Sequence, residues 1–121
     1  MPALILTTSA LLMAFFFLVA GAQKLALRTE VTSNLARLGV GGAFSRSIGA
    51  AEILGAVGIA VGPWYPPLGV AAAAGLAALM LGAIGFHAQA GDYRRIGRHR
   101  DAVVPPILMV MLLVLCAALL T

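Results

Sequence analysis

The chain has 121 residues, of which 62% are apolar and 10% are charged, with a formal net charge of +4 and a mean hydropathy of +1.05. Soluble domains are about 45–50% apolar and about 25% charged, so this composition excludes an ordinary water-soluble domain and indicates an integral membrane protein. The length allows one domain, 1–121. The single cysteine, Cys116, excludes an internal disulfide and a thiolate-based metal cluster.

Four apolar segments are each long enough to cross a bilayer, for which about 20 residues suffice. We expect these four helices over about 3–24, 44–62, 68–90 and 104–121. Between the second and the third, the run Pro63-Trp64-Tyr65-Pro66-Pro67 predicts a tight hairpin with its two aromatic residues at the membrane interface. The predicted fold is an all-α, integral membrane bundle of four transmembrane helices.

A polar stretch follows the first apolar segment and has helical periodicity of its own. Its apolar residues recur at helical spacing with polar residues between them: Leu27, Val31, Leu35 and Leu38. This pattern predicts a short amphipathic helix lying in the membrane interface. The glycines Gly39, Gly41 and Gly42 should end it.

The basic residues predict the orientation of the chain in the membrane. All eight lysines and arginines lie in or beside the first and third loops: Lys24, Arg28, Arg37, Arg46, Arg94, Arg95, Arg98 and Arg100. Cytoplasmic loops carry an excess of Lys and Arg, so we expect loops 25–43 and 91–103 to be cytoplasmic. Both termini and the Trp-Tyr hairpin would then be extracytoplasmic, in a multi-pass protein of the cell membrane. Topology thus explains the positive charge without a nucleic-acid partner.

Small residues predict how the helices pack, because helices in lipid associate where small side chains let two backbones approach. The second apolar segment has such a stripe, formed by Ala51, Gly55, Gly58 and Gly62. The third has a similar one, formed by Gly75, Ala78, Gly82 and Gly85. We expect these two stripes to face each other in a close antiparallel pair. The fourth segment is bulky, with Met109, Met111 and many leucines, and should face lipid or a partner subunit.

Four polar residues stand where apolar ones would be less costly: Lys24, Glu52, His87 and Gln89. A lone carboxylate in the membrane costs a few kcal/mol or more, so Glu52 should face inward and have a partner. Lys24 is the natural partner, since Gly21 one turn earlier makes room for a neighbouring helix. We expect a Lys24–Glu52 ion pair between the first two helices, with His87 or Gln89 as a hydrogen-bonding neighbour. The pair could be a structural staple or the wall of a pocket for the polar head of a quinone or lipid.

Other kinds of site are not indicated by the sequence. The two histidines do not form a His-x-x-x-His pair, and His99 lies among arginines, so no metal site is predicted. The glycines at 39–42 lack the preceding strand that a phosphate-binding loop requires. No Ser–His–Asp or Cys–His arrangement is readable. Whether the chain is an enzyme is therefore left open, and any catalytic role would be redox or accessory in kind.

The pattern of these residues resembles the DoxX-like family of small four-helix membrane proteins. The resemblance rests on Phe17-x-x-x-Gly21-x-x-Lys24, on the segment IGAAEILGAVG over 48–58, on Ala71 to Gly75, and on Gly82-Ala83 with His87. It extends over nearly the whole chain. The family takes its name from a subunit of an archaeal thiosulfate:quinone oxidoreductase. The resemblance therefore implies an accessory, quinone-linked role in a membrane redox complex.

Three functions follow as expectations. The first is an accessory subunit of a membrane complex, redox- or quinone-linked, whose polar pocket around Glu52 holds a quinone or a bound lipid. The second is a purely structural subunit that stabilises a larger membrane assembly. The third is a small-molecule transporter formed by several copies, because four glycine-rich helices leave little room for a pore. The expected partners are the lipid bilayer and either other membrane subunits or further copies of the chain.

Overall fold

The computed structural model describes residues 2–121, and all of the regular secondary structure within them is helical. Its elements are α1 (Ala3–Leu25), α2 (Thr29–Arg37), α3 (Gly42–Val61), α4 (Pro66–Gln89), the 3₁₀ turns η1 (Asp92–Arg94) and η2 (Arg100–Val103), and α5 (Val104–Leu120). Four segments, namely α1, α3, α4 and η2 with α5, are long and apolar enough to span a membrane. The predicted four-helix membrane bundle, with a short helix in the first loop, is confirmed.

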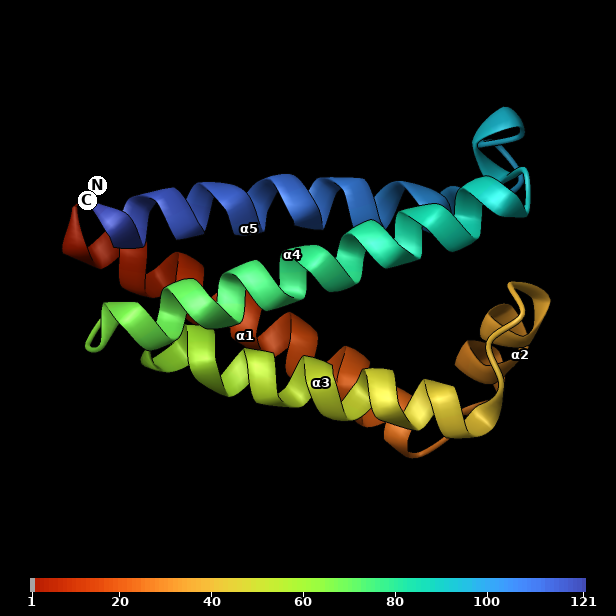
Figure 1. The fold of residues 1–121 in the computed structure, drawn as a ribbon, viewed down its shortest axis with the longest axis horizontal. Helices are drawn as coiled ribbons and strands as arrows, with labels where there is room; N and C mark the ends of the chain where they lie inside the picture. Colours follow the sequence, from red (N-terminus) through yellow and green to blue (C-terminus); the bar gives the residue numbers. More distant parts are fainter. Residues whose placement is uncertain (1) are drawn as a thin grey trace.

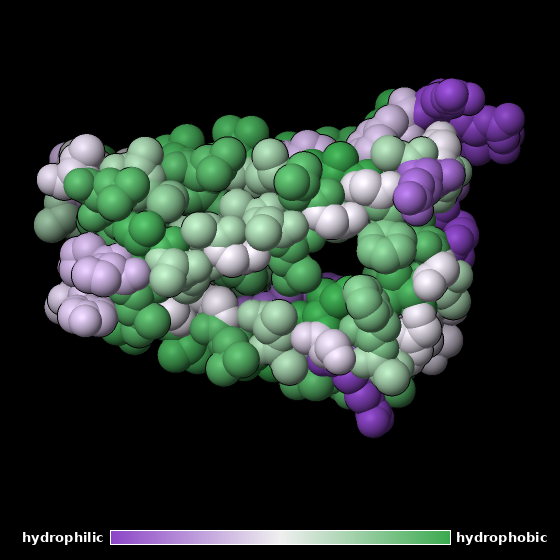
Figure 2. Space-filling model, viewed as in Figure 1, coloured by the Kyte–Doolittle hydropathy of each residue, from purple (hydrophilic) through white to green (hydrophobic). Residues whose placement is uncertain are grey.

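The two basic loops lie at the same end of the bundle (Figure 1). Residue 2, the C-terminus and the α3–α4 hairpin lie at the opposite end, so the four long helices run alternately up and down. Figure 2 shows apolar surface along the bundle and strongly hydrophilic residues gathered at the loop end. The chain therefore has one charged end, and which side of the membrane this end faces remains the prediction made from its arginines.

Two glycines make the contact between α1 and α3. A Cβ added to Gly21 would lie 2.6 Å from the carbonyl oxygen of Gly49, and one added to Gly49 would lie 2.6 Å from the carbonyl oxygen of Gly21. Atoms do not approach this closely, so only glycine fits at either position. The space that the sequence predicted beside Gly21 is occupied by the backbone of α3. The two helices consequently cross backbone to backbone, as small residues allow in membrane bundles.

The predicted small-residue stripe on α3 packs against α4, near the hairpin. Added Cβ atoms at Gly55, Gly58 and Gly62 would meet Leu76, Ala72 and Gly69, respectively. The close antiparallel pair is therefore present, and α4 contributes Gly69 and Ala72 to it. At the hairpin tip Trp64 and Tyr65 are exposed, as interfacial aromatic residues would be.

The prediction that the small-residue stripe on α4 packs against α3 is wrong. Cβ atoms added to Gly75, Gly82 and Gly85 would meet nothing within 4 Å. The reason is the relative direction of the helices, because α3 and α4 separate toward the loop end (Figure 1). Of the predicted stripe, Ala78 and Gly82 line the cavity that this separation creates.

Helix α5 packs on α4 through one of its faces. That face is buried and consists of leucines, namely Leu108, Leu112, Leu115 and Leu119. The opposite face exposes bulky apolar side chains, including Ile107, Val110, Met111 and Val114. An exposed apolar face of this kind suits lipid or another membrane subunit, in agreement with the expectation for this segment.

Candidate functional site

A cavity of about 490 Å³ lies where α3 and α4 separate, between the long helices and beneath α2. Figure 2 shows the surface hollowed in this region, with mainly apolar walls. The apolar lining includes Phe16, Phe17, Phe44, Met80, Ala83, Phe86 and Leu108. The charged or titratable side chains in the lining are Lys24, Glu52, His87 and Asp101. The cavity is thus an apolar space with polar groups on its wall.

The ion pair between Lys24 and Glu52 forms part of this wall. Lys24 Nζ lies 2.7 Å from Glu52 Oε1, and the glutamate side chain is 2% exposed. The glycine crossing places the two residues together. An added Cβ at Gly21 would lie 3.3 Å from Glu52 Cβ, and one at Gly49 would lie 2.9 Å from Lys24 Cβ. The two residues therefore flank the point where α1 and α3 touch.

The pair leaves the hydrogen-bonding capacity of Glu52 largely unused. Its buried Oε1 lies 2.7 Å from Lys24 Nζ, and no other residue among 2–121 donates a hydrogen bond to the carboxylate. A carboxylate can accept about four hydrogen bonds. Buried polar groups are nearly always hydrogen-bonded, because a buried acceptor without a donor costs free energy. Glu52 therefore lines the cavity with acceptor capacity that its single contact, to Lys24, does not use.

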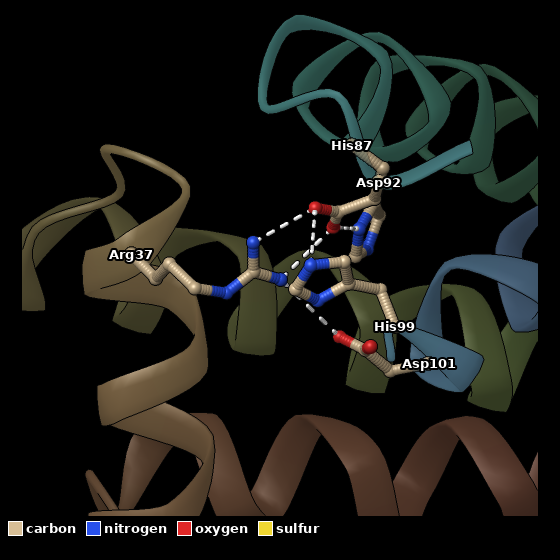
Figure 3. A network of polar contacts seen from close by, with 5 residues as sticks. All are labelled: Arg37, His87, Asp92, His99 and Asp101. Atoms are coloured by element: carbon tan, nitrogen blue, oxygen red, sulfur yellow. Dashed lines mark hydrogen bonds and ion pairs between the residues drawn. The ribbon is translucent and has the colours of Figure 1, made fainter. Parts of the chain in front are cut away.

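A second polar cluster, at the loop end, is centred on Asp92 (Figure 3). Arg37 Nη1 and Nη2 donate to Asp92 Oδ1 and Oδ2, both at 2.9 Å, and His87 Nδ1 lies 2.6 Å from Oδ2. The carboxylate is fully buried. His99 Nε2 lies 3.7 Å from Asp92 Oδ1, and Asp101 Oδ2 lies 3.8 Å from Arg37 Nη2. We call these five residues the Asp92 cluster.

Electrostatics explain why a buried aspartate is stable in this cluster. The two hydrogen bonds from the Arg37 guanidinium, followed by the bond to His87, hold the pKa of Asp92 well below its usual value of 3.8. In return, the Asp92 carboxylate raises the pKa of Arg37. Bidentate Arg–carboxylate pairs are among the strongest hydrogen-bonded contacts in proteins. Because Arg37 belongs to α2 and Asp92 to η1, the cluster ties the two basic loops together at the mouth of the cavity.

The structure separates the two residues expected to neighbour the ion pair. His87 is buried and lines the cavity, but its Nδ1 is paired with Asp92. Gln89 is exposed and does not line the cavity. Two residues along an α-helix turn a side chain by about 200°, so these two residues point to opposite sides of α4. Neither side chain hydrogen-bonds to the Lys24–Glu52 pair within residues 2–121.

Sequence reasoning did not find Arg37, Asp92, His99 and Asp101. Charged residues are ordinary in loops, and Arg37 and Asp92 are 55 positions apart. One signal was available, because the chain has only four acidic residues. An acid within an arginine-rich loop of such a chain is a candidate partner for arginine. Among residues 2–121, no three side chains of His, Cys, Asp or Glu converge as they would for a metal ion.

The α2 helix and two aromatic rings close the cavity at the loop end. Leu35 and Leu38 of the α2 segment contribute to the lining. Phe44 and Phe86 make an edge-to-face contact between α3 and α4, with ring centroids 6.2 Å apart. The hollow seen in Figure 2 lies between α3 and α4, along the apolar side of the bundle.

These features define the class of protein as a small membrane bundle of four helices with a polar-lined cavity among them. The model of the DoxX-like family matches residues 8–119. The chain belongs to this family, as its motifs had indicated. No curated protein and no solved structure matches it significantly.

Proposed function

We propose that this protein binds the polar head of a membrane amphiphile, with a quinone as the favoured ligand, and serves as an accessory subunit of a redox-linked membrane complex. The observation that carries the proposal is the cavity beside Glu52. Ligand pockets are mostly apolar and have a few placed polar groups, with volumes of about 300–1,000 Å³. A space of about 490 Å³ with an incompletely satisfied carboxylate on its wall fits this description.

The shape and chemistry of the cavity favour an amphiphile over a water-soluble ligand. The aromatic and aliphatic walls suit an apolar ring or chain, and the polar groups suit one hydrogen-bonding head. Lys24 can donate to a carbonyl oxygen, and Glu52 can accept from a hydroxyl. A quinone presents a carbonyl in its oxidised form and a hydroxyl in its reduced form, so this pair could bind both.

An accessory role is favoured over an autonomous enzyme because electron transfer requires a redox partner. Cys116, the single cysteine, cannot form a dithiol within the chain. The exposed bulky face of α5 offers an apolar surface of the kind that membrane subunits bury against each other. Electrons would then reach the bound ligand from another subunit.

A structural subunit is the second candidate, and the direct Lys24–Glu52 contact favours it. Under this reading the ion pair only fastens α1 to α3, and the cavity is filled by ordinary lipid tails. The two readings predict different co-purifying molecules, which makes them separable.

The test is to extract the protein into polymer-bounded native discs, remove bulk lipid by washing, and identify the bound small molecules by mass spectrometry. Two matched variants on α4 sharpen the result. Ala83→Phe places a ring in the cavity lining, whereas Ala74→Phe places the same ring at an exposed position outside it. We expect quinone at near-stoichiometric amounts in the wild type and in Ala74→Phe, and little in Ala83→Phe. Equal quinone in all three preparations would contradict the proposal.

We also propose that the loop end faces the cytoplasm. The arginine-rich third loop and the basic first loop meet there through Arg37 and Asp92. Because basic loops remain cytoplasmic, both termini would be extracytoplasmic. Single cysteines placed at the hairpin tip and at residue 97 in a Cys116→Ala background would be labelled from opposite sides of the membrane. Labelling of residue 97 from outside intact cells would overturn this orientation.

A further inference from the structure

We propose that His87 is the residue that discriminates between the oxidised and the reduced head group. This inference rests on the proposed function, since it concerns a ligand in the same cavity. His87 would accept a hydrogen bond at its free ring nitrogen from a phenolic hydroxyl, a donor that the reduced head group has and the oxidised one lacks. It thus acts as a specificity-determining residue, and Asp92 acts as its positioning residue.

The geometry assigns a separate role to each ring nitrogen of His87. Nδ1 lies 2.6 Å from Asp92 Oδ2, and a carboxylate can only accept, so Nδ1 carries a proton. In the neutral ring Nε2 is then the acceptor. Nε2 makes no hydrogen bond to any side chain or backbone group of residues 2–121, although the ring is 6% exposed and lines the cavity. The ring that lines the cavity thus has one satisfied nitrogen and one without a partner among residues 2–121.

The Asp92 cluster keeps this arrangement rigid. Arg37 holds both oxygens of Asp92, which fixes the carboxylate against His87. The Tyr93 ring lies edge-to-face against the imidazole, with centroids 6.3 Å apart. The histidine therefore has little freedom to turn its Nδ1 side toward the cavity. Hydrogen bonding at one ring nitrogen commonly sets the tautomer and the task of the other.

Charged and titratable groups lie near His87 on several elements. On η1 and η2 and between them these are Asp92, Tyr93, His99 and Asp101, on α2 the group is Arg37, and across the cavity they are Lys24 and Glu52. The chain has two histidines. His99→Gln therefore leaves His87 as the single histidine.

The experiment uses the full chain carrying His99→Gln in nanodiscs of zwitterionic lipid, with histidine rings labelled with ¹⁵N. The probes are decylubiquinone and its reduced form, decylubiquinol, kept under argon. Affinities for both probes are measured at pH 8, and the Nε2 resonance is followed by NMR. The affinities are also measured for His87→Phe and for Asp92→Asn in the His99→Gln background.

We expect the reduced probe to bind about fivefold more tightly than the oxidised probe, because one hydrogen bond contributes about 1 kcal/mol. The reduced probe should shift the Nε2 resonance. In His87→Phe the preference for the reduced probe should vanish, and in Asp92→Asn it should weaken, because the ring is no longer oriented.

Two results would overturn the inference while leaving the proposed function intact. One is an unchanged preference for the reduced probe in His87→Phe, and the other is binding of the reduced probe that leaves the Nε2 resonance unchanged. Failure of both probes to bind would overturn the proposed function and this inference together. If His87→Phe does not fold, the NMR measurement on the His99→Gln protein still decides the question.

Discussion

Two buried carboxylates, Glu52 and Asp92, are neutralised in different ways. Asp92 accepts two hydrogen bonds from Arg37 and pairs with His87, so both of its oxygens are satisfied. Glu52 has one contact, between its Oε1 and Lys24 Nζ at 2.7 Å, and no other residue among 2–121 donates a hydrogen bond to it. Both side chains are at most 2% exposed.

The difference separates a structural role from a binding role. A fully satisfied buried network rigidifies the parts of the fold that it joins, here the two loops. An incompletely satisfied group beside a cavity retains a contact for a ligand, and natural proteins deviate from complete satisfaction mainly at functional sites. On this account Arg37 and Asp92 hold the wall of the cavity in place, whereas the Lys24–Glu52 pair and His87 contact what enters it.

The largest effect should come from separating the helices that carry the Lys24–Glu52 pair. Gly49→Leu would drive a side chain into the backbone of α1, where even a Cβ would lie 2.6 Å from the Gly21 oxygen. We expect a loss of about 3 kcal/mol or more and a broad, aggregated profile in size-exclusion chromatography. The control is Gly85→Leu, since an added Cβ there meets nothing within 4 Å. Similar monodisperse profiles for both variants would show that the crossing is not tight.

The next largest effect should come from removing the centre of the loop-end cluster. Asp92→Ala leaves the Arg37 guanidinium and His87 without their shared partner. We expect the melting temperature in detergent to fall on the order of 10 °C, as for other broken buried pairs. Asp101→Ala is the matched control, because Asp101 is 45% exposed and contacts Arg37 only at 3.8 Å. An equal fall in both variants would deny the central position of Asp92.

A smaller effect is expected at the membrane-buried pair. Glu52→Gln leaves Lys24 unpaired, and we expect it to lower the free energy of unfolding by about 1–2 kcal/mol, because the lysine stem can carry its charge toward the loop end. The double variant Lys24→Met/Glu52→Gln should recover most of this loss, since no buried charge remains. Thermal melts of the four proteins form a double-mutant cycle. An unchanged melt for Glu52→Gln would count against a stabilising ion pair.

The smallest effect near neutral pH should be that of pH on the Asp92 cluster. Since its folded-state pKa lies below the ordinary value of 3.8, Asp92 contributes stability that is fully present above that value and is lost as the pH falls through the folded pKa. Between pH 8 and pH 5 this residue should cause no change. The melting temperatures of the wild type and Asp92→Asn should therefore differ by the same amount throughout that range, and should become equal only in strong acid. Equal melting temperatures already near pH 6 would contradict a lowered pKa for Asp92.

The sequence was sufficient to predict the bundle and one of the two carboxylate sites. Apolar segments of spanning length leave few alternatives for a fold, and Glu52 is conspicuous because nothing around it is charged. The glycine stripe on α3 was also interpretable, since one helix face held all of its members. These are local signals, each contained in about twenty residues.

The remaining features depend on how helices are directed relative to one another. Two small-residue stripes exist on α4, and spacing alone does not show that Gly69 and Ala72, rather than Gly75 and Gly82, meet α3. The divergence that opens the cavity is a tertiary property. The Asp92 cluster likewise joins two loops that are far apart in the chain, with charges that a loop would carry in any case.

The most direct test of the central claim, that the cavity beside Glu52 receives the head group, is photolabelling with an azidoquinone that bears a ten-carbon tail. Adducts are located by mass spectrometry in nanodisc-embedded wild type, Ala83→Phe and Ala74→Phe. The account predicts adducts concentrated on the cavity-lining segments of α3 and α4, displaced by unlabelled quinone, retained in Ala74→Phe and lost in Ala83→Phe. Adducts spread over the exposed face of α5, equal in all three proteins, would contradict it.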